Sequence, residues 1–112
     1  MKLKRKFNVG RMRFVYVCSP YRGEVVKNLN YTQECCRKVF SKNDIPIAPH
    51  LYFPMFMNDN IEEVRELAFE MNKRLIDMCD CLCIFGSVIS EGMQIEIDYA
   101  NSIGKKVYKC GN

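Results

Sequence analysis

The stretch from Ser90 to Ala100, with the sequence SEGMQIEIDYA, combines residue types that could bind an anion and react with a bound molecule. Ser90 and Gly92 form a small hydroxyl-and-glycine turn at the start of a predicted helix. A helix N-terminus has unpaired N–H groups and the positive end of the helix dipole, so it suits a phosphate. Glu96 follows Gly92 by four residues and therefore lies on the same helical face. This arrangement could hold a nucleotide and attack its sugar.

A second candidate is the segment CSPYRGE from Cys18 to Glu24. Ser19 offers a hydroxyl, Arg22 can pair with a phosphate through two hydrogen bonds, and Gly23 lets the backbone approach a ligand closely. The segment is too short for a P-loop and lacks the Gly-x-Gly-x-x-Gly pattern. A plain turn with a surface arginine remains an equal alternative.

The only histidine, His50, lies in PHLYF at the end of a predicted strand. It could act as a general base, contact a phosphate or hydrogen-bond a substrate, or it could be a structural histidine bonded to a backbone carbonyl. The aromatic residues at positions 52, 53 and 56 could stack on a base, or belong to the core or a subunit contact. Tyr16 and Tyr21 are further candidates for substrate contacts.

Strands and helices are predicted to alternate along the chain. The predicted strands cover residues 13–18, 45–48, 80–85 and 106–110, and the predicted helices cover 24–42, about 61–78 and 90 to about 103. Asp59 or Asn60 is expected to cap the second helix. Such alternation predicts about four parallel strands with right-handed crossovers, in a small three-layer doubly wound α/β fold of Rossmann or flavodoxin type. The turns after the first three strands should converge on one crevice.

The chain of 112 residues has the length of one domain, in which residues 1–12 form a basic leader and the net charge is +4. Nothing in it suggests a membrane span or a signal peptide, and nucleic acid is an improbable partner. The seven cysteines are odd in number and lie mostly in apolar segments, which predicts free thiols and a cytoplasmic protein. Cys79, Cys81 and Cys83 lack the usual metal-ligand spacing, so we expect no metal and no cofactor.

The helix SEGMQIEIDYA resembles the signature helix of the nucleoside 2-deoxyribosyltransferase superfamily, in which a glycine precedes the nucleophilic glutamate by four residues. The branch that hydrolyses nucleoside 5′-monophosphates also has a serine two residues before that glycine, and a first loop similar to CSPYRG. The segments YVCSPYRG and PHLYF are similar to an uncharacterised set of bacterial and phage proteins near this superfamily. The likeness spans Arg13 to Cys110. It implies that Glu96 is the nucleophile, with a phosphate-side set of Arg22, Gly23, Ser90 and Gly92.

The chain departs from that pattern in two places. The superfamily usually has an aspartate eight residues before the aspartate that opens the third strand, where it positions the sugar and protonates the leaving base. Counting back from Asp80, this chain has Asn72, which can hydrogen-bond a hydroxyl but cannot donate an acid proton. Asp98 also replaces the glycine that follows the glutamate. Transferases of the superfamily are longer and often share residues between subunits, so the resemblance implies a homodimer or larger homo-oligomer.

The sequence therefore favours an enzyme that hydrolyses or transfers at the N-glycosidic bond of a (deoxy)nucleoside 5′-monophosphate. Its catalytic residues would be Glu96 and Asn72, and its ligand a nucleotide or nucleoside. The departure at Asn72 favours an alternative, a non-catalytic module that senses or sequesters a nucleotide. A third hypothesis is a small interaction protein that uses the aromatic loop of residues 51–57.

Overall fold

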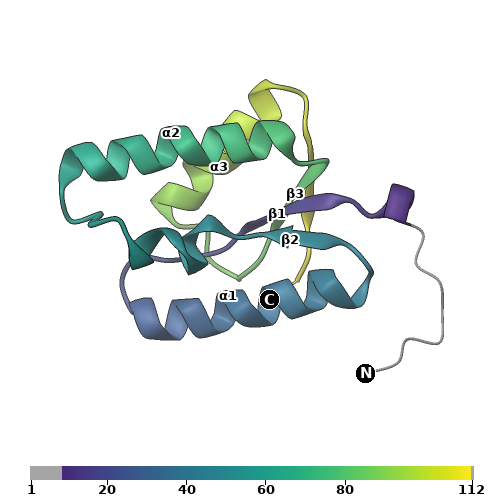
Figure 1. Cartoon of the computed structure of the whole chain (residues 1–112), viewed down its shortest axis with the longest axis horizontal. Coiled ribbons are helices and arrows are strands. Elements are labelled where there is room, and N and C mark those ends of the chain that lie inside the picture. The colour runs from purple at the N-terminus through teal and green to yellow at the C-terminus, as the bar shows by residue number, and fades with distance from the viewer. Residues whose placement is uncertain (1–8, 112) are drawn as a thin grey trace.

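In a computed structural model, which describes residues 9–111, a four-stranded sheet lies between two layers of helices (Figure 1). The strands are β1 (Phe14–Cys18), β2 (Ile45–Ile47), β3 (Cys81–Ile84) and β4 (Lys106–Lys109). They are all parallel, in the order β2-β1-β3-β4. The predicted small Rossmann- or flavodoxin-like α/β fold is thus confirmed. Most of the predicted leader, residues 1–8, lies outside the described residues.

Three α-helices and three short 3-10 helices connect the strands. The α-helices are α1 (Val25–Ser41), α2 (Glu62–Met78) and α3 (Glu91–Ser102), and the 3-10 helices are η1 (Val9–Arg11), η2 (Pro49–Leu51) and η3 (Phe53–Met55). Figure 1 shows α1 on one face of the sheet and α2 with α3 on the other. The predicted loop after the second strand therefore contains two helical turns.

The core consists of two apolar clusters, one on each face of the sheet. Tyr16 and Leu82 pack with α2 and α3, whereas Val15 and Val17 pack with α1. Neighbouring residues of β1 thus point to opposite faces, as the pleat of a strand requires, and both faces are covered. This explains why β1 and β3 are apolar along their length.

The proline of the second strand has the position that its chemistry requires. Pro46 lies in β2, which is an edge strand of the sheet and pairs only with β1. Because proline has no N–H to donate, it is tolerated at an edge and not in the middle of a sheet. The edge position of β2 therefore accommodates this proline.

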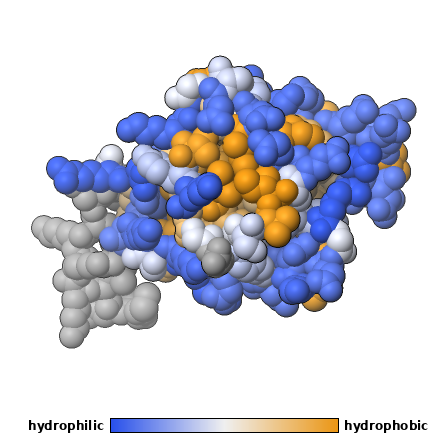
Figure 2. All heavy atoms as spheres, turned by 180° about the vertical axis from the view of Figure 1, so that it is seen from behind, coloured by the Kyte–Doolittle hydropathy of each residue, from blue (hydrophilic) through white to orange (hydrophobic). Residues whose placement is uncertain are grey.

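The side opposite to the view of Figure 1 has an apolar area in its middle, surrounded by mostly hydrophilic side chains (Figure 2). None of the helices formed by residues 9–111 has the length and apolar character needed to cross a membrane.

Candidate functional site

A pocket of about 640 Å³ lies beyond the carboxyl ends of β1 and β3. The loop after β1, the η2–η3 segment and the start of α3 all contribute to its wall, so the predicted convergence of three turns on one crevice is observed. The strand order is β2-β1-β3-β4, so the chain goes from β1 to one side of the sheet and then crosses back to add β3 on the other side of β1. Open α/β sheets bind ligands at such a switch point, beyond the carboxyl ends of the strands. Eight of the residues singled out in the sequence line the pocket: Ser19, Tyr21, Arg22, His50, Asn72, Ser90, Gly92 and Glu96.

Ser90 caps α3 at the wall of the pocket. Its Oγ accepts a hydrogen bond from the N–H of Met93 at 3.2 Å, as expected for a serine N-cap. The first turn of α3 faces the pocket, and Gly92 leaves that turn without a side chain. A Cβ at Gly92 would touch the ring of Phe69 at 3.5 Å, an ordinary contact, so packing alone does not require glycine here.

Glu96 lies one turn further into α3, with only 9% of its surface exposed. Its Oε2 accepts two hydrogen bonds, from the Tyr16 hydroxyl at 2.5 Å and from the Asn72 side-chain amide at 3.1 Å. None of the ion pairs among residues 9–111 involves it. Burial raises the pKa of Glu96 to about 7, although hydrogen bonds from Tyr16, Cys18 and Asn72 act in the opposite direction.

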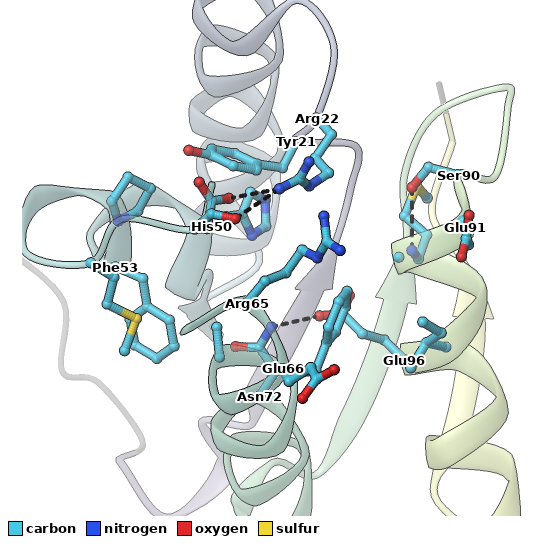
Figure 3. A pocket seen from close by; sticks show the side chains of 18 of the residues that line it. Tyr21, Arg22, His50, Phe53, Arg65, Glu66, Asn72, Ser90, Glu91 and Glu96 are labelled. Carbon is cyan, nitrogen blue, oxygen red and sulfur yellow. Dashed lines mark hydrogen bonds and ion pairs between the residues drawn. The ribbon is translucent and has the colours of Figure 1, made fainter. Parts of the chain in front are cut away.

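Asn72 reaches Glu96 from α2, and Figure 3 shows the two side chains facing each other from neighbouring helices. Because an ionised carboxylate only accepts hydrogen bonds, the amide must present its nitrogen to Glu96. Its oxygen, Oδ1, is then left buried and has no hydrogen-bond partner among the described residues. A buried acceptor without a partner is costly, so the orientation of this amide is set by its bond to Glu96 and not by its own hydrogen-bonding needs.

Arg22 is already engaged on the opposite wall. Its guanidinium donates to the backbone oxygen of Asp59 at 3.0 Å and lies 3.8 Å from that residue's carboxylate (Figure 3). The residue that caps α2 is Ile61, without a side-chain hydrogen bond, so the prediction that Asp59 or Asn60 caps this helix is wrong. Asp59 turns toward Arg22 instead.

His50 belongs to a polar network at the edge of the pocket. Its Nε2 lies 2.8 Å from the Ser19 hydroxyl and 3.1 Å from that of Thr32, and these two hydroxyls are 2.7 Å apart. Thr32 also donates to the backbone oxygen of Asn28. The proton of Thr32 is therefore used, Ser19 must donate to Thr32, and the hydrogen between Ser19 and His50 must come from Nε2.

In a neutral His50 ring, this network puts the proton on Nε2 and leaves Nδ1 as the acceptor nitrogen. Burial lowers the pKa of His50 to about 4, so the ring is uncharged at pH 7. A neutral ring does not supply charge to a phosphate. Such a low pKa also makes it a weak general base, and a hydrogen bond to the ligand is the role left open to it.

Two of the predicted site residues do not line the pocket. Tyr16 is completely buried behind Glu96, so it positions the carboxylate and does not face the cavity. Gly23 ends the loop after β1 with a φ of +96°, a backbone conformation that other residues adopt only with strain. An added Cβ at Gly23 would meet no atom within 4 Å, so glycine is needed there for its backbone conformation and not to avoid a clash.

Sequence reasoning missed part of the wall that α2 provides. Arg65, Glu66 and Phe69 all line the pocket. A signal for Arg65 was present, because it precedes Asn72 by seven residues, which is two helical turns and therefore the same face. The spacing alone does not identify Arg65 as a pocket residue, because many residues of a helix share a face with Asn72.

The Tyr16 hydroxyl should hold down the pKa of Glu96. In Tyr16→Phe we expect this pKa to rise by about one pH unit, because a hydrogen bond to a charged group is worth about 1.5–3 kcal/mol and part of it is regained by relaxation. An NMR titration of the Glu96 side-chain carboxyl carbon measures the value. Tyr99→Phe is the matched control, since Tyr99 donates to Asp77 at 2.5 Å on the surface. An unchanged Glu96 pKa in Tyr16→Phe would show that the hydroxyl does not stabilise the charged form.

Among known families, the chain matches one described as Domain of unknown function (DUF7768), over residues 13–110. The chain belongs to the DUF7768 family. The DUF7768 match covers β1 to β4 and therefore every residue of the pocket. No curated protein matches the chain.

No group of three or more His, Cys, Asp or Glu side chains within residues 9–111 is arranged to hold a metal ion. All seven cysteines are free thiols.

Proposed function

We propose that this protein cleaves the N-glycosidic bond of a nucleoside 5′-monophosphate, with Glu96 as the nucleophile. The observation that carries the proposal is the state of Glu96. It is a nearly buried carboxylate at a pocket, hydrogen-bonded on one oxygen by Tyr16 and Asn72, and paired with none of the described cations. Buried carboxylates without a cation are expensive, and a fold that maintains one at a pocket has a use for it.

The reaction takes place in two steps. A Glu96 carboxylate oxygen forms a bond to the anomeric carbon of the sugar, while the bond from that carbon to the base breaks and its electrons leave with the base nitrogen, which then takes a proton from water. A water molecule next attacks the anomeric carbon and releases the carboxylate, losing a proton to solvent. If a ring nitrogen of a second base attacked the anomeric carbon in place of water, it would release the Glu96 carboxylate, lose its proton to solvent and complete a transfer. Hydrolysis needs only the groups in this pocket.

The resemblance places the phosphate at the Ser90 end of the pocket and the sugar between Glu96 and Asn72. The side chain of Asn72 supports this orientation, because it lines the pocket beside Glu96 and is of a type that can hydrogen-bond a sugar hydroxyl. The direct test is to incubate the protein with a panel of ribo- and deoxyribonucleoside 5′-monophosphates and measure free base by chromatography. The proposal requires base release from at least one of them.

Departure of the base is expected to be the slow step, because Asn72 cannot protonate it. Asn72→Asp should therefore accelerate base release. A carboxyl group there would lie beside Glu96, and two adjacent carboxyls share a proton, so one of them is a general acid near neutral pH. Since general-acid catalysis contributes about 10²–10⁴-fold, we expect base release at pH 6 to rise by at least about tenfold. Asn101→Asp, on the exposed side of α3, is the control. A rate that stays level or falls in Asn72→Asp would show that base protonation does not limit the reaction.

The orientation of Asn72 also supports a second candidate function, a module that binds a nucleotide without turning it over. Its amide donates to Glu96, which restrains the carboxylate, and it has no acid proton for the base. This candidate predicts a nucleotide-induced rise in melting temperature with no free base, and a rise of equal size in Glu96→Gln. Base release from the unmodified protein excludes it.

We further propose a cytoplasmic homo-oligomer. Seven free thiols fit a reducing compartment, and the apolar area in Figure 2 is a surface that a second copy would cover. The pocket described above is formed by residues of a single DUF7768 chain. Light scattering of the purified protein measures its mass in solution.

A further inference from the structure

Arg65 is a charged side chain of the pocket that has no ion-pair partner among residues 9–111. It belongs to the first turn of α2, is half-buried and lines the cavity. Figure 3 shows its guanidinium extending from α2 into the space between Arg22 and Ser90. It forms none of the ion pairs found among residues 9–111, and none of its side-chain N–H groups has an acceptor there. Its neighbours in the wall do not neutralise it.

Three other arginines of residues 9–111 form ion pairs, whereas Arg11 and Arg74 form none but do not line the pocket. Arg13 pairs with Asp44, Arg22 with Asp59, and Arg37 with Glu34. The pocket wall also contains carboxylates, from Glu66 and Glu91, yet none of them reaches Arg65. A guanidinium whose five donors face a cavity matches the geometry of a phosphate, which it can bind through two parallel hydrogen bonds.

The start of α3 adds donors on the other side of the same space. Ser90 accepts the N–H of Met93, and the first backbone hydrogen bond of the helix comes from Gln94. Within residues 9–111, the N–H groups of Glu91 and Gly92 therefore remain without acceptors, at the positive end of the helix dipole. An anion between Arg65 and this helix end would satisfy donors from both sides.

We infer that Arg65, more than Arg22, binds the phosphate of the ligand and makes the pocket select a phosphorylated nucleoside over the nucleoside itself. The inference deepens the proposed function and rests on it, because only the proposed function identifies the phosphorylated ligand as a nucleoside. Arg65 lies two turns, or about 10 Å, along α2 from Asn72, which separates a phosphate end from a sugar end. Arg22 contributes less, because its guanidinium already forms a hydrogen bond and an ion pair with Asp59.

The test uses inorganic phosphate as the first probe, followed by a nucleoside 5′-monophosphate and its parent nucleoside. Dissociation constants are measured by calorimetry for the unmodified protein, Arg65→Met, Arg22→Met and the control Arg74→Met, which changes an exposed arginine of the same helix. We expect Arg65→Met to weaken phosphate and monophosphate binding by about 10–100-fold and to leave nucleoside binding unchanged. Arg22→Met should have a smaller effect, and Arg74→Met none.

A charge change of the opposite sign gives a second measurement. Asp59→Asn removes a negative charge from the pocket wall and ends the ion pair with Arg22, although the hydrogen bond from Arg22 to the backbone oxygen of residue 59 remains, so it should tighten phosphate binding by several-fold. Arg65→Lys keeps the charge and should retain part of the affinity, and a normal melting temperature shows that each variant is folded. The inference is overturned if inorganic phosphate does not bind, if Arg65→Met binds it normally, or if Arg22→Met causes the larger loss.

These outcomes are independent of turnover. If Arg65→Met loses phosphate affinity while no nucleotide releases its base, the phosphate site stands and the glycosidase is wrong. If base is released at the same rate with nucleosides and monophosphates, and Arg65→Met leaves phosphate binding unchanged, the glycosidase stands and the role of Arg65 is wrong.

Discussion

Replacing Glu96 by glutamine is expected to reduce base release by at least about a thousandfold, which is about 4 kcal/mol in the barrier. Glutamine has nearly the same shape and keeps a carbonyl oxygen for the Tyr16 hydroxyl, so the pocket should retain its form. An amide, however, cannot form the ester with the anomeric carbon that the mechanism requires. The measurement is free base per unit time under saturating nucleotide, with affinity determined in parallel.

Asp98→Asn is the matched control for this variant. Asp98 is an exposed carboxylate of the same helix, hydrogen-bonded to Gln94 at 2.8 Å and outside the pocket, so its loss should leave the rate unchanged. Acid quenching of the unmodified protein during turnover should also trap a sugar phosphate on the peptide that contains Glu96. A Glu96→Gln variant that keeps the rate of the unmodified protein would eliminate this carboxylate as the nucleophile.

The same substitution is expected to stabilise the fold above neutral pH. Burial holds the pKa of Glu96 at about 7 in the folded state, against 4.5 for a free glutamate. Since each tenfold change in an ionisation equilibrium is worth about 1.4 kcal/mol, ionising the buried side chain destabilises the protein by about 3 kcal/mol. Glutamine does not ionise and avoids this cost.

The sign follows from which state holds the proton. Below pH 4.5 Glu96 is protonated in both the folded and the unfolded chain, so it adds no pH dependence. Between pH 4.5 and 7 the unfolded chain loses the proton while the folded chain keeps it, and stability falls as pH rises. Above pH 7 the full cost is present. The free-energy difference between Glu96→Gln and the unmodified protein should therefore grow by about 3 kcal/mol from pH 4 to pH 8.

Urea unfolding at several pH values measures this difference. His50, with a pKa of about 4 in the folded state, also makes stability depend on pH, but it does so equally in both proteins and cancels. If the free energies of unfolding of the two proteins changed in parallel with pH, Glu96 would ionise with an ordinary pKa and its burial would carry no cost.

The elements of this fold could be predicted because their signals are local. Unbroken apolar runs predict β1 and β3, since both faces of a central parallel strand are buried. Helical spacing predicts α2 and α3, and the serine before Glu91 marks the start of the latter. The proline in β2 identifies an edge. Each of these inferences uses only neighbours within a few residues.

The site was harder to predict because its contacts are not local. The cap expected from Asp59 fails because Arg22, from a distant loop, binds that residue instead. Tyr16 looked like a residue for the ligand, but the packing of α3 on β1 turns its hydroxyl to Glu96. Arg65 is one of many charged residues in a surface helix, and only the closed pocket distinguishes it from Arg74. Pairings across the fold decide these roles, and a single sequence does not show them.

The hydrogen bond between Tyr16 and Glu96 joins residues 80 positions apart, from β1 to α3. Contacts of such long range form only after the intervening chain has been ordered, because the entropy of closing so large a loop must be overcome first. The raised pKa of Glu96 is thus a property of the completed domain. A chain that has left the ribosome only as far as β3 contains Tyr16 and Asn72 but not Glu96, so the activity proposed for Glu96 should appear only with the last folding step.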